Sequence, residues 1–258
     1  LLGEDVVHAD HGPGRGVLSS HRILTTGHHR GAGMFGPATG KPIRLRAIAD
    51  CLVVGDVITE EWLVRDTAAI ALQVGLDPGE MGRRLAAADA AAGKTPWHLG
   101  QWEAVRRGER EASAVIQAHP AAALSRGLIE GMINDTDLGL VRRVHDRASI
   151  LEGTLHRSFA GTDEIERFWL GYLAALPDAR VVVDHSIALA ERGRPVRTST
   201  RWRLAGTHAG HGALGPPTGA KVLILGITQH HVVGDRVVAE WTVVDELATH
   251  RMIGLQAG

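Results

Sequence analysis

Three residues near the carboxyl terminus have the types and spacing needed for acid/base chemistry: Gln229, His231 and Asp245. Gln229 and His231 stand two positions apart in an apolar segment, so on a strand their side chains point to the same face. Asp245 ends the next apolar segment, where it shares a face with Trp241. A carboxyl group among apolar side chains has a raised pKa, and a nearby histidine or glutamine can orient it. We therefore predict one cavity with Asp245 and His231 as catalytic groups and Gln229 and Trp241 on its wall.

A structural interpretation of the same residues stays open. Asp245 stands where a strand ends, so its carboxylate is also suited to cap the backbone of the following turn. His231 is then an ordinary half-buried residue of the sheet. An open apolar cavity with both side chains on its wall favours an enzyme, and an Asp245 bonded to backbone amides favours the structural role.

An earlier part of the chain repeats this region. Residues 27–76 align without a gap on residues 206–255, a constant offset of 179, and "GDVITEEWLVRD" matches "GDRVVAEWTVVD". At this offset Asp66 corresponds to Asp245, which makes Asp66 a candidate pocket residue. Gln229 falls on Asp50 and His231 on Leu52, so the neighbours of the acid differ. We expect a duplicated domain with its chemistry in the second copy.

The elements around these residues follow from periodicity. In the second copy, residues 179–190, 196–208, 221–233 and 236–245 are β-branched runs separated by turn residues, which predicts an antiparallel meander. Residues 121–133, 138–151 and 162–176 have helical spacing of apolar side chains. A sheet curled around such helices encloses a conical pocket suited to a small molecule.

Three regions follow along the chain. Residues 1–76 form the sheet portion of a first domain that lacks its N-terminal helices, residues 77–117 a helical linker, and residues 118–258 a second domain. "PGEMGRRLAAADAAAG" and "WHLGQWEAVRRG" predict the linker helices. Two alternatives remain for the first sheet: these helices cover it, or a segment that precedes residue 1 does.

Composition excludes several classes of function. The formal net charge of −1, without a basic run, argues against a nucleic-acid partner. Cys51 is the only cysteine, which rules out an internal disulfide and multi-cysteine metal sites and fits a reducing cytoplasm. No apolar run reaches the roughly 20 residues that span a bilayer, and "LLGEDVVHADHG" lacks the features of a signal peptide. We expect a cytoplasmic protein with no membrane partner.

Two motif classes are set aside. "GAGMFG" and "GHGALG" match the dinucleotide pattern GxGxxG, but each precedes Pro-x-Thr-Gly and a strand instead of a helix, so we interpret both as glycine-rich hairpin connections. The fifteen histidines include no HExxH and no pair with a carboxylate at helical spacing. No metal and no cofactor are therefore predicted.

These motifs together resemble the SnoaL-like polyketide cyclases, an α+β cone family that is related to nuclear transport factor 2 (NTF2-like). The segments that carry the resemblance are "FAGTDEIERFWLGYLAALPDARVVVD", "GTHAGHGALGPPTGAKV" and "VVGDRVVAEWTVVDELA", with "GMFGPATGK" and "EEWLVRDTAAIALQVG" in the first copy. The resemblance implies two tandem NTF2-like cone domains, each a curled, mostly antiparallel sheet around helices. Characterised cyclases of this family have a single domain, so the tandem suggests an intrachain pseudo-dimer in place of their homodimer and leaves further homo-oligomers open.

The resemblance further implies a reaction. In such cyclases an intramolecular aldol cyclisation of a polyketide proceeds without metal or cofactor. Asp245 is then the residue that takes and returns the proton, while Gln229 and His231 support the enolate and His208 lies in the pocket.

Two alternatives remain. Epoxide hydrolysis on the same fold needs a second carboxylate and an arginine near Asp245; Arg201 and Arg203 are candidates for the arginine, but the sequence indicates no second inward acid. A non-catalytic small-molecule-binding or interaction module needs neither a base nor a substrate.

Overall fold

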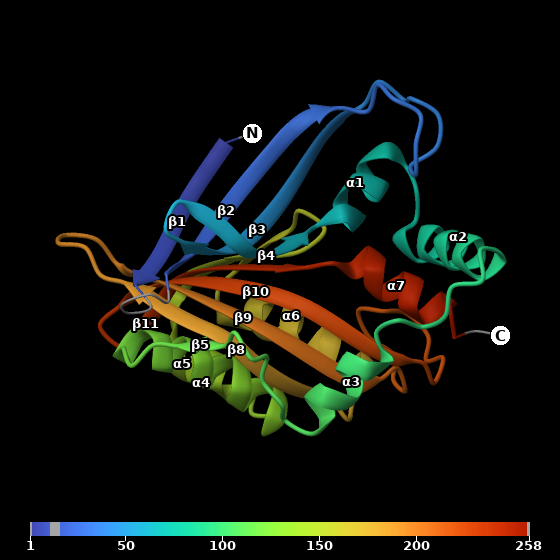
Figure 1. The fold of residues 1–258 in the computed structure, drawn as a ribbon. Helices are drawn as coiled ribbons and strands as arrows, with labels where there is room; N and C mark the ends of the chain where they lie inside the picture. Colours follow the sequence, from blue (N-terminus) through green and yellow to red (C-terminus); the bar gives the residue numbers. More distant parts are fainter. Residues whose placement is uncertain (1, 11–15, 257–258) are drawn as a thin grey trace.

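The computed structural model describes residues 2–10 and 16–256 and shows a mixed α+β fold built on two curled sheets (Figure 1). The first sheet has four strands in the order β1-β2-β3-β4, each antiparallel to its neighbours. They are β1 (Leu2–Asp10), β2 (Val17–His28), β3 (Pro42–Val54) and β4 (Val57–Arg65). Gly55, with a φ of 63°, forms the tight turn between β3 and β4.

The second sheet has seven strands in the order β5-β8-β9-β10-β11-β6-β7. They are β5 (Val115–Ile116), β6 (His145–Glu152), β7 (Ser158–Ala160), β8 (Arg180–Leu189), β9 (Val196–Thr207), β10 (Lys221–Val233) and β11 (Arg236–Val244). Strands β8 to β11 are the predicted antiparallel meander, whereas β5 and β6 join it in parallel. The sheet is therefore mostly antiparallel, as expected.

Helices cover one face of the seven-stranded sheet. They are α4 (Pro120–Asn134), α5 (Gly139–Val144) and α6 (Thr162–Ala175), and α7 (Glu246–Gly254) follows the last strand. The main core lies between α4, α6 and the sheet, where Trp169 and Trp202 are fully buried. The prediction of a helix over 138–151 is wrong in its second half, because β6 begins at His145 and pairs with β11.

The linker contains α2 (Pro78–Ala91) and α3 (Leu99–Arg106), as predicted, after a short α1 (Thr67–Val74). Helix α2 packs on α7, where a side chain on Gly82 would meet His250 at 2.4 Å, so only glycine allows this approach. Helix α3 packs Trp102 and Val105 on the face of the second sheet that is opposite to α4 and α6. The alternative that the linker covers the first sheet is wrong, since both helices pack mainly on elements of the second.

The two sheets pack face to face, and positions 179 residues apart meet one another. Ser20 Oγ is 2.7 Å from Ser199 Oγ, and an apolar cluster joins Ile48 to Ile227 and Val64 to Val243. Two cation–π contacts are equivalent to each other at the offset of 179, because Arg22 lies over Trp241 at 3.7 Å and Arg201 lies over Trp62 at 4.2 Å. The four-stranded sheet and α3 therefore cover the outer face of the seven-stranded sheet (Figure 1).

The glycine-rich motifs are connections between antiparallel strands, as predicted. Each is closed by a small bridge, Gly33 with Gly36 and Gly212 with Gly215, and each leads into a strand. Neither motif opens a helix, so neither has the geometry of a dinucleotide-binding turn.

Candidate functional site

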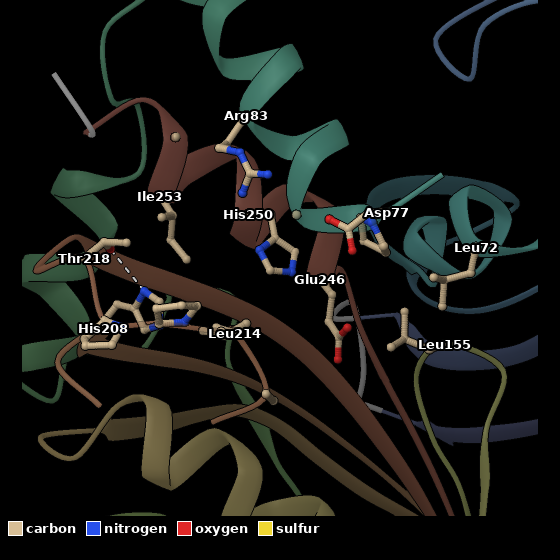
Figure 2. Close-up of a pocket in the computed structure, with 17 residues that line it drawn as sticks. Leu72, Asp77, Arg83, Leu155, His208, Leu214, Thr218, Glu246, His250 and Ile253 are labelled. Carbon is tan, nitrogen blue, oxygen red and sulfur yellow. Dashed lines mark hydrogen bonds between the residues drawn. The ribbon is translucent and has the colours of Figure 1, made fainter. Parts of the chain in front are cut away.

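A cavity of about 600 Å³ lies where α7, the β9–β10 connection and the linker helix α2 meet (Figure 2). Its walls are mostly apolar and include Leu72, Leu155, Leu214, Pro216 and Ile253. Its size is within the range of pockets that bind small organic molecules. Such a wall suits an apolar ligand, and the few polar groups that reach it are the candidates for chemistry.

Glu246, the first residue of α7, places its carboxylate in this cavity (Figure 2). Its side chain is buried, and both of its hydrogen bonds fall on Oε1, from Thr154 Oγ1 at 2.9 Å and Tyr172 Oη at 2.5 Å. Oε2 accepts no hydrogen bond from the part of the chain that the structure describes. The carboxylate is thus fixed through one oxygen and has the other available.

Tyr172 keeps its proton and donates a hydrogen bond to this carboxylate. Burial, together with the charge of Glu246, raises the pKa of Tyr172 well above its usual value. A phenol that stays protonated keeps its O–H group for the hydrogen bond to Glu246. The bond therefore orients the carboxylate without competing with it for protons.

Histidines and an arginine form the opposite side of the cavity. Burial lowers the pKa of His250, so this imidazole is neutral near pH 7, and Figure 2 shows it above Glu246. Burial also lowers the pKa of His208, whose Nδ1 lies 3.0 Å from Thr218 Oγ1. Arg83 of α2 adds a guanidinium group at the same wall. The cavity thus combines two carboxylates, Glu246 and the helix-capping Asp77, with neutral and cationic hydrogen-bond donors.

Asp66 supports this site from the first sheet. Its carboxylate accepts hydrogen bonds from the backbone N–H groups of Leu155 and His156, each at 2.9 Å. Both residues have a left-handed backbone, with φ of 58° and 54°, which costs about 1 kcal/mol or more for a non-glycine residue. Asp66 therefore holds the strained loop that carries Leu155 and Thr154 to the cavity, and does not itself line it.

Asp245 caps a helix. Its Oδ1 accepts a hydrogen bond from Ala248 N at 3.0 Å, and the side chain is absent from the cavity wall. Burial raises the pKa of Asp245, while the backbone hydrogen bonds lower it. This is the placement that the structural interpretation of Asp245 requires.

Gln229, His231 and Trp241 do not meet Asp245 around one cavity. Gln229 accepts a hydrogen bond from Arg22 at 3.0 Å between the two sheets, and His231 Nε2 lies 3.1 Å from Asp5 Oδ2. The expectation of a shared cavity is therefore wrong in its geometry. These side chains point to the outer face of the sheet, which the first sheet covers, and only His208 of the predicted set lines the cavity.

Arg201 and Arg203, the arginines that epoxide hydrolysis would require, are also on the outer face. Arg201 forms an ion pair with Glu111 at 2.9 Å, and Arg203 with Asp184 at 2.7 Å. Neither arginine lines the cavity. Neither arginine of β9 is therefore placed to assist an acid in this pocket in epoxide hydrolysis.

Glu246, Tyr172 and His250 were not identified from the sequence. Asp245 and Glu246 are adjacent, and strand periodicity does not say which of them faces inward once the helix begins. One signal was present: at the offset of 179, Glu246 falls on Thr67, so this acid belongs to the second copy alone.

Comparison with known proteins identifies the family. The model of the SnoaL-like polyketide cyclases matches residues 123–253, just over half of the chain. The chain belongs to this family. No curated protein matches it.

Solved structures of similar fold include three from Streptomyces species. AclR of Streptomyces galilaeus is 21% identical, with 52% of this chain and 83% of that chain covered and a TM-score of 0.43. IdmH of Streptomyces antibioticus is 21% identical, with 53% and 99% covered and a TM-score of 0.42. TsrD of Streptomyces laurentii is 14% identical, with 54% and 99% covered and a TM-score of 0.44.

Among the described residues, no helix has both the length and the apolar character needed to cross a membrane.

Proposed function

We propose that this SnoaL-like protein catalyses proton transfer at carbon in a small, apolar, carbonyl-rich molecule, with Glu246 as the base. The observation that carries the proposal is the buried carboxylate on the wall of an apolar cavity, fixed through Oε1 with Oε2 available. A desolvated, oriented carboxylate is a suitable base for a carbon acid.

An intramolecular aldol cyclisation fits this arrangement. Glu246 Oε2 takes a proton from a carbon between carbonyl groups, and the enolate carbon forms a bond to a second carbonyl carbon of the same molecule. The resulting alkoxide takes the proton back from Glu246, so atoms and electrons balance without a co-reactant. His250, His208 and Arg83 are the donors available for the developing oxyanion.

The test uses proton exchange, because it needs no knowledge of the natural substrate. An aromatic 1,3-dicarbonyl compound is incubated with the protein in D2O, and loss of its activated C–H signal is followed by proton NMR. Glu246→Gln should lower the catalysed exchange rate about 100-fold or more, the usual contribution of a general base. Asp245→Asn is the matched control, since asparagine also caps helices.

The same pair of variants separates the competing proposals. If Asp245→Asn or His231→Asn abolishes exchange and Glu246→Gln does not, then Asp245 and His231 have the catalytic roles predicted from the sequence and Glu246 is not the base. If no probe exchanges but several bind in the cavity, the protein is a non-catalytic binding module. The carboxylates of Asp66 and Asp245 accept hydrogen bonds from backbone N–H groups, which favours a non-catalytic binding module.

We also propose that the two sheets derive from a tandem duplication of one cone domain and pack as an intrachain pseudo-dimer. The contacts that repeat at the offset of 179 support this origin, above all the two arginine–tryptophan pairs. The proposed base then belongs to the second domain alone, because Thr67 has the position equivalent to Glu246, while Leu72 and Arg83 from outside that domain complete the wall.

A further inference from the structure

A second polar cluster lies inside the fold and has no part in the proposed reaction. It consists of His145 at the start of β6, His230 on β10 and Glu240 on β11. The side chains of all three are fully buried, and none lines the cavity around Glu246. We call these three residues the His–Glu–His cluster.

Three ligand atoms converge in this cluster. Glu240 Oε2 is 2.8 Å from His145 Nε2 and 3.7 Å from His230 Nε2, and all three atoms lie within 4.8 Å of one another. His230 and Glu240 are direct partners in the β10–β11 pairing, so the hairpin register itself brings them together.

The outer atoms of the three side chains are held in place. His145 Nδ1 lies 3.3 Å from the carbonyl oxygen of Val141, and His230 Nδ1 lies 3.0 Å from Ser125 Oγ. Glu240 Oε1 accepts a hydrogen bond from Thr242 Oγ1 at 2.7 Å. Oxygen partners of this kind commonly orient metal-binding histidines and carboxylates.

These outer contacts determine what the inner atoms can do. A carbonyl oxygen only accepts, so His145 Nδ1 must donate to Val141, and a neutral His145 then presents the lone pair of Nε2 to Glu240. His230 Nε2 has no hydrogen-bond partner among the described residues and points at the same carboxylate oxygen. His145 Nε2 and Glu240 Oε2 are thus two acceptors that face one another and need a cation between them, either a proton or a metal ion.

The ligand set favours a metal. Two imidazole nitrogens and a carboxylate oxygen are a common donor set for zinc, with bonds of about 2.0–2.2 Å. Ligand atoms around such a tetrahedral ion lie about 3.3 Å apart, and the two separations from Glu240, 2.8 and 3.7 Å, are on either side of this value. The two histidine nitrogens lie within 4.8 Å of each other, so they would have to approach by up to about 1.5 Å to admit an ion.

We propose that His145, His230 and Glu240 bind one divalent transition-metal ion, with zinc the best match, as a structural site. The ion would fasten the start of β6 to the β10–β11 hairpin, where the β6–β11 pairing has a register irregularity between Val237 and Ala239. No short motif indicates this site, because its residues come from three strands and are separated by 85 and 10 positions.

The test starts from the full chain treated with a chelator and dialysed. Addition of zinc should give one bound ion per chain by elemental analysis and raise the melting temperature by about 5 °C or more. Glu240→Gln should abolish both effects. Glu61→Gln is the matched control, because Glu61 has the equivalent hairpin position in the first sheet, beside Cys51 and on the exposed surface.

Two outcomes would overturn the proposal. If Glu240→Gln binds as much zinc as the unmodified chain, the metal occupies surface histidines. If the unmodified chain binds none and its melting temperature does not change, the cluster is a buried imidazolium–carboxylate pair. Should Glu240→Gln fail to fold, cobalt(II) and the unmodified chain decide: a stoichiometric visible absorption typical of tetrahedral coordination supports the site, and its absence refutes it.

Discussion

Asp66 and Asp245 occupy equivalent positions in the two copies, but their carboxylates have different partners. Asp245 caps its own helix, whereas Asp66 leaves α1 without a side-chain cap and reaches across to the loop beside the cavity. Burial raises the pKa of Asp66 to about 6, and its amide hydrogen bonds only partly oppose this. The residue that holds the strained loop is thus also one that titrates under mild acid.

The raised pKa of Asp66 predicts a pH-dependent stability. An aspartate in the unfolded chain titrates near pH 3.9, so between about pH 4 and 6 the folded state holds more protons than the unfolded state. The contribution of Asp66 to stability is therefore complete below about pH 4 and is lost as the pH rises through about 6, with a slope of up to about 1.4 kcal/mol per pH unit. Urea unfolding at several pH values measures it.

Asp66→Asn should remove this pH dependence, and the exposed Asp56→Asn should leave it intact. Asparagine has one acceptor oxygen for two amide groups, so the variant should also lose about 1–3 kcal/mol at all pH values for the unpaired amide. A difference between wild type and Asp66→Asn that stays constant from pH 4 to 6 would show that Asp66 is not desolvated.

At the residue scale, the predicted base Asp245 is one position away from Glu246, the carboxylate that lines the cavity. Period-two alternation correctly grouped Gln229 with His231, and the same rule places Glu240 and Thr242 on one face of β11. Alternation cannot say which group faces the helices, because both faces of this sheet are covered and both groups contain polar residues. That choice depends on the packing of the first sheet against the second, a contact between residues about 180 positions apart.

At the element scale, the β9–β10 connection shows why its glycines are needed. A side chain on Gly212 would stand 2.2 Å from the carbonyl oxygen of Gly171 and 2.6 Å from Ala175 N, both in α6. A side chain at the equivalent Gly33 meets nothing within 4 Å. The loop is thus pressed onto α6 in the second copy, and it is this loop that supplies Leu214 and Pro216 to the cavity.

This difference predicts unequal effects of the same substitution. Gly212→Ala should destabilise the protein by about 1–3 kcal/mol, the usual range for an overpacked site. Gly33→Ala should change stability by about 0.5 kcal/mol or less. Chemical denaturation measures both, and equal losses would contradict the close approach of the loop to α6.

Periodicity predicted the meander and most helices because each has a long apolar pattern. It failed at residues 145–151, where "HDRASIL" continues the helical spacing of α5. The parallel partner β11 begins more than 90 residues later, and its backbone groups are what make a strand of this segment. A local pattern has no access to such a partner.

At the scale of the whole molecule, the two sheets are joined by apolar clusters, one of which packs Val7 and Leu18 on Ile187. Ile48 and Ile227 are fully buried and belong to the same small cluster with Val64 and Val243. Buried polar pairs surround this cluster, and Asp66 ties the end of the first sheet to the loop beside the cavity. A sheet that exposes one face gains little stability by itself, so we expect the first sheet to depend on the second.

This dependence predicts a single unfolding transition. Ile48→Ala and Ile227→Ala should each cost about 2–5 kcal/mol and shift the same cooperative transition, with its steepness unchanged, because each removes a buried side chain from one shared core. Since both residues belong to one cluster, the double variant should deviate from additivity. Circular dichroism and tryptophan fluorescence during urea unfolding should coincide in every variant. The contrary result is two transitions in Ile48→Ala, the earlier of which Ile227→Ala does not shift. The two sheets would then unfold independently. The hydrogen bonds from Asp66 to the loop beside the cavity would in that case be lost before the second domain unfolds.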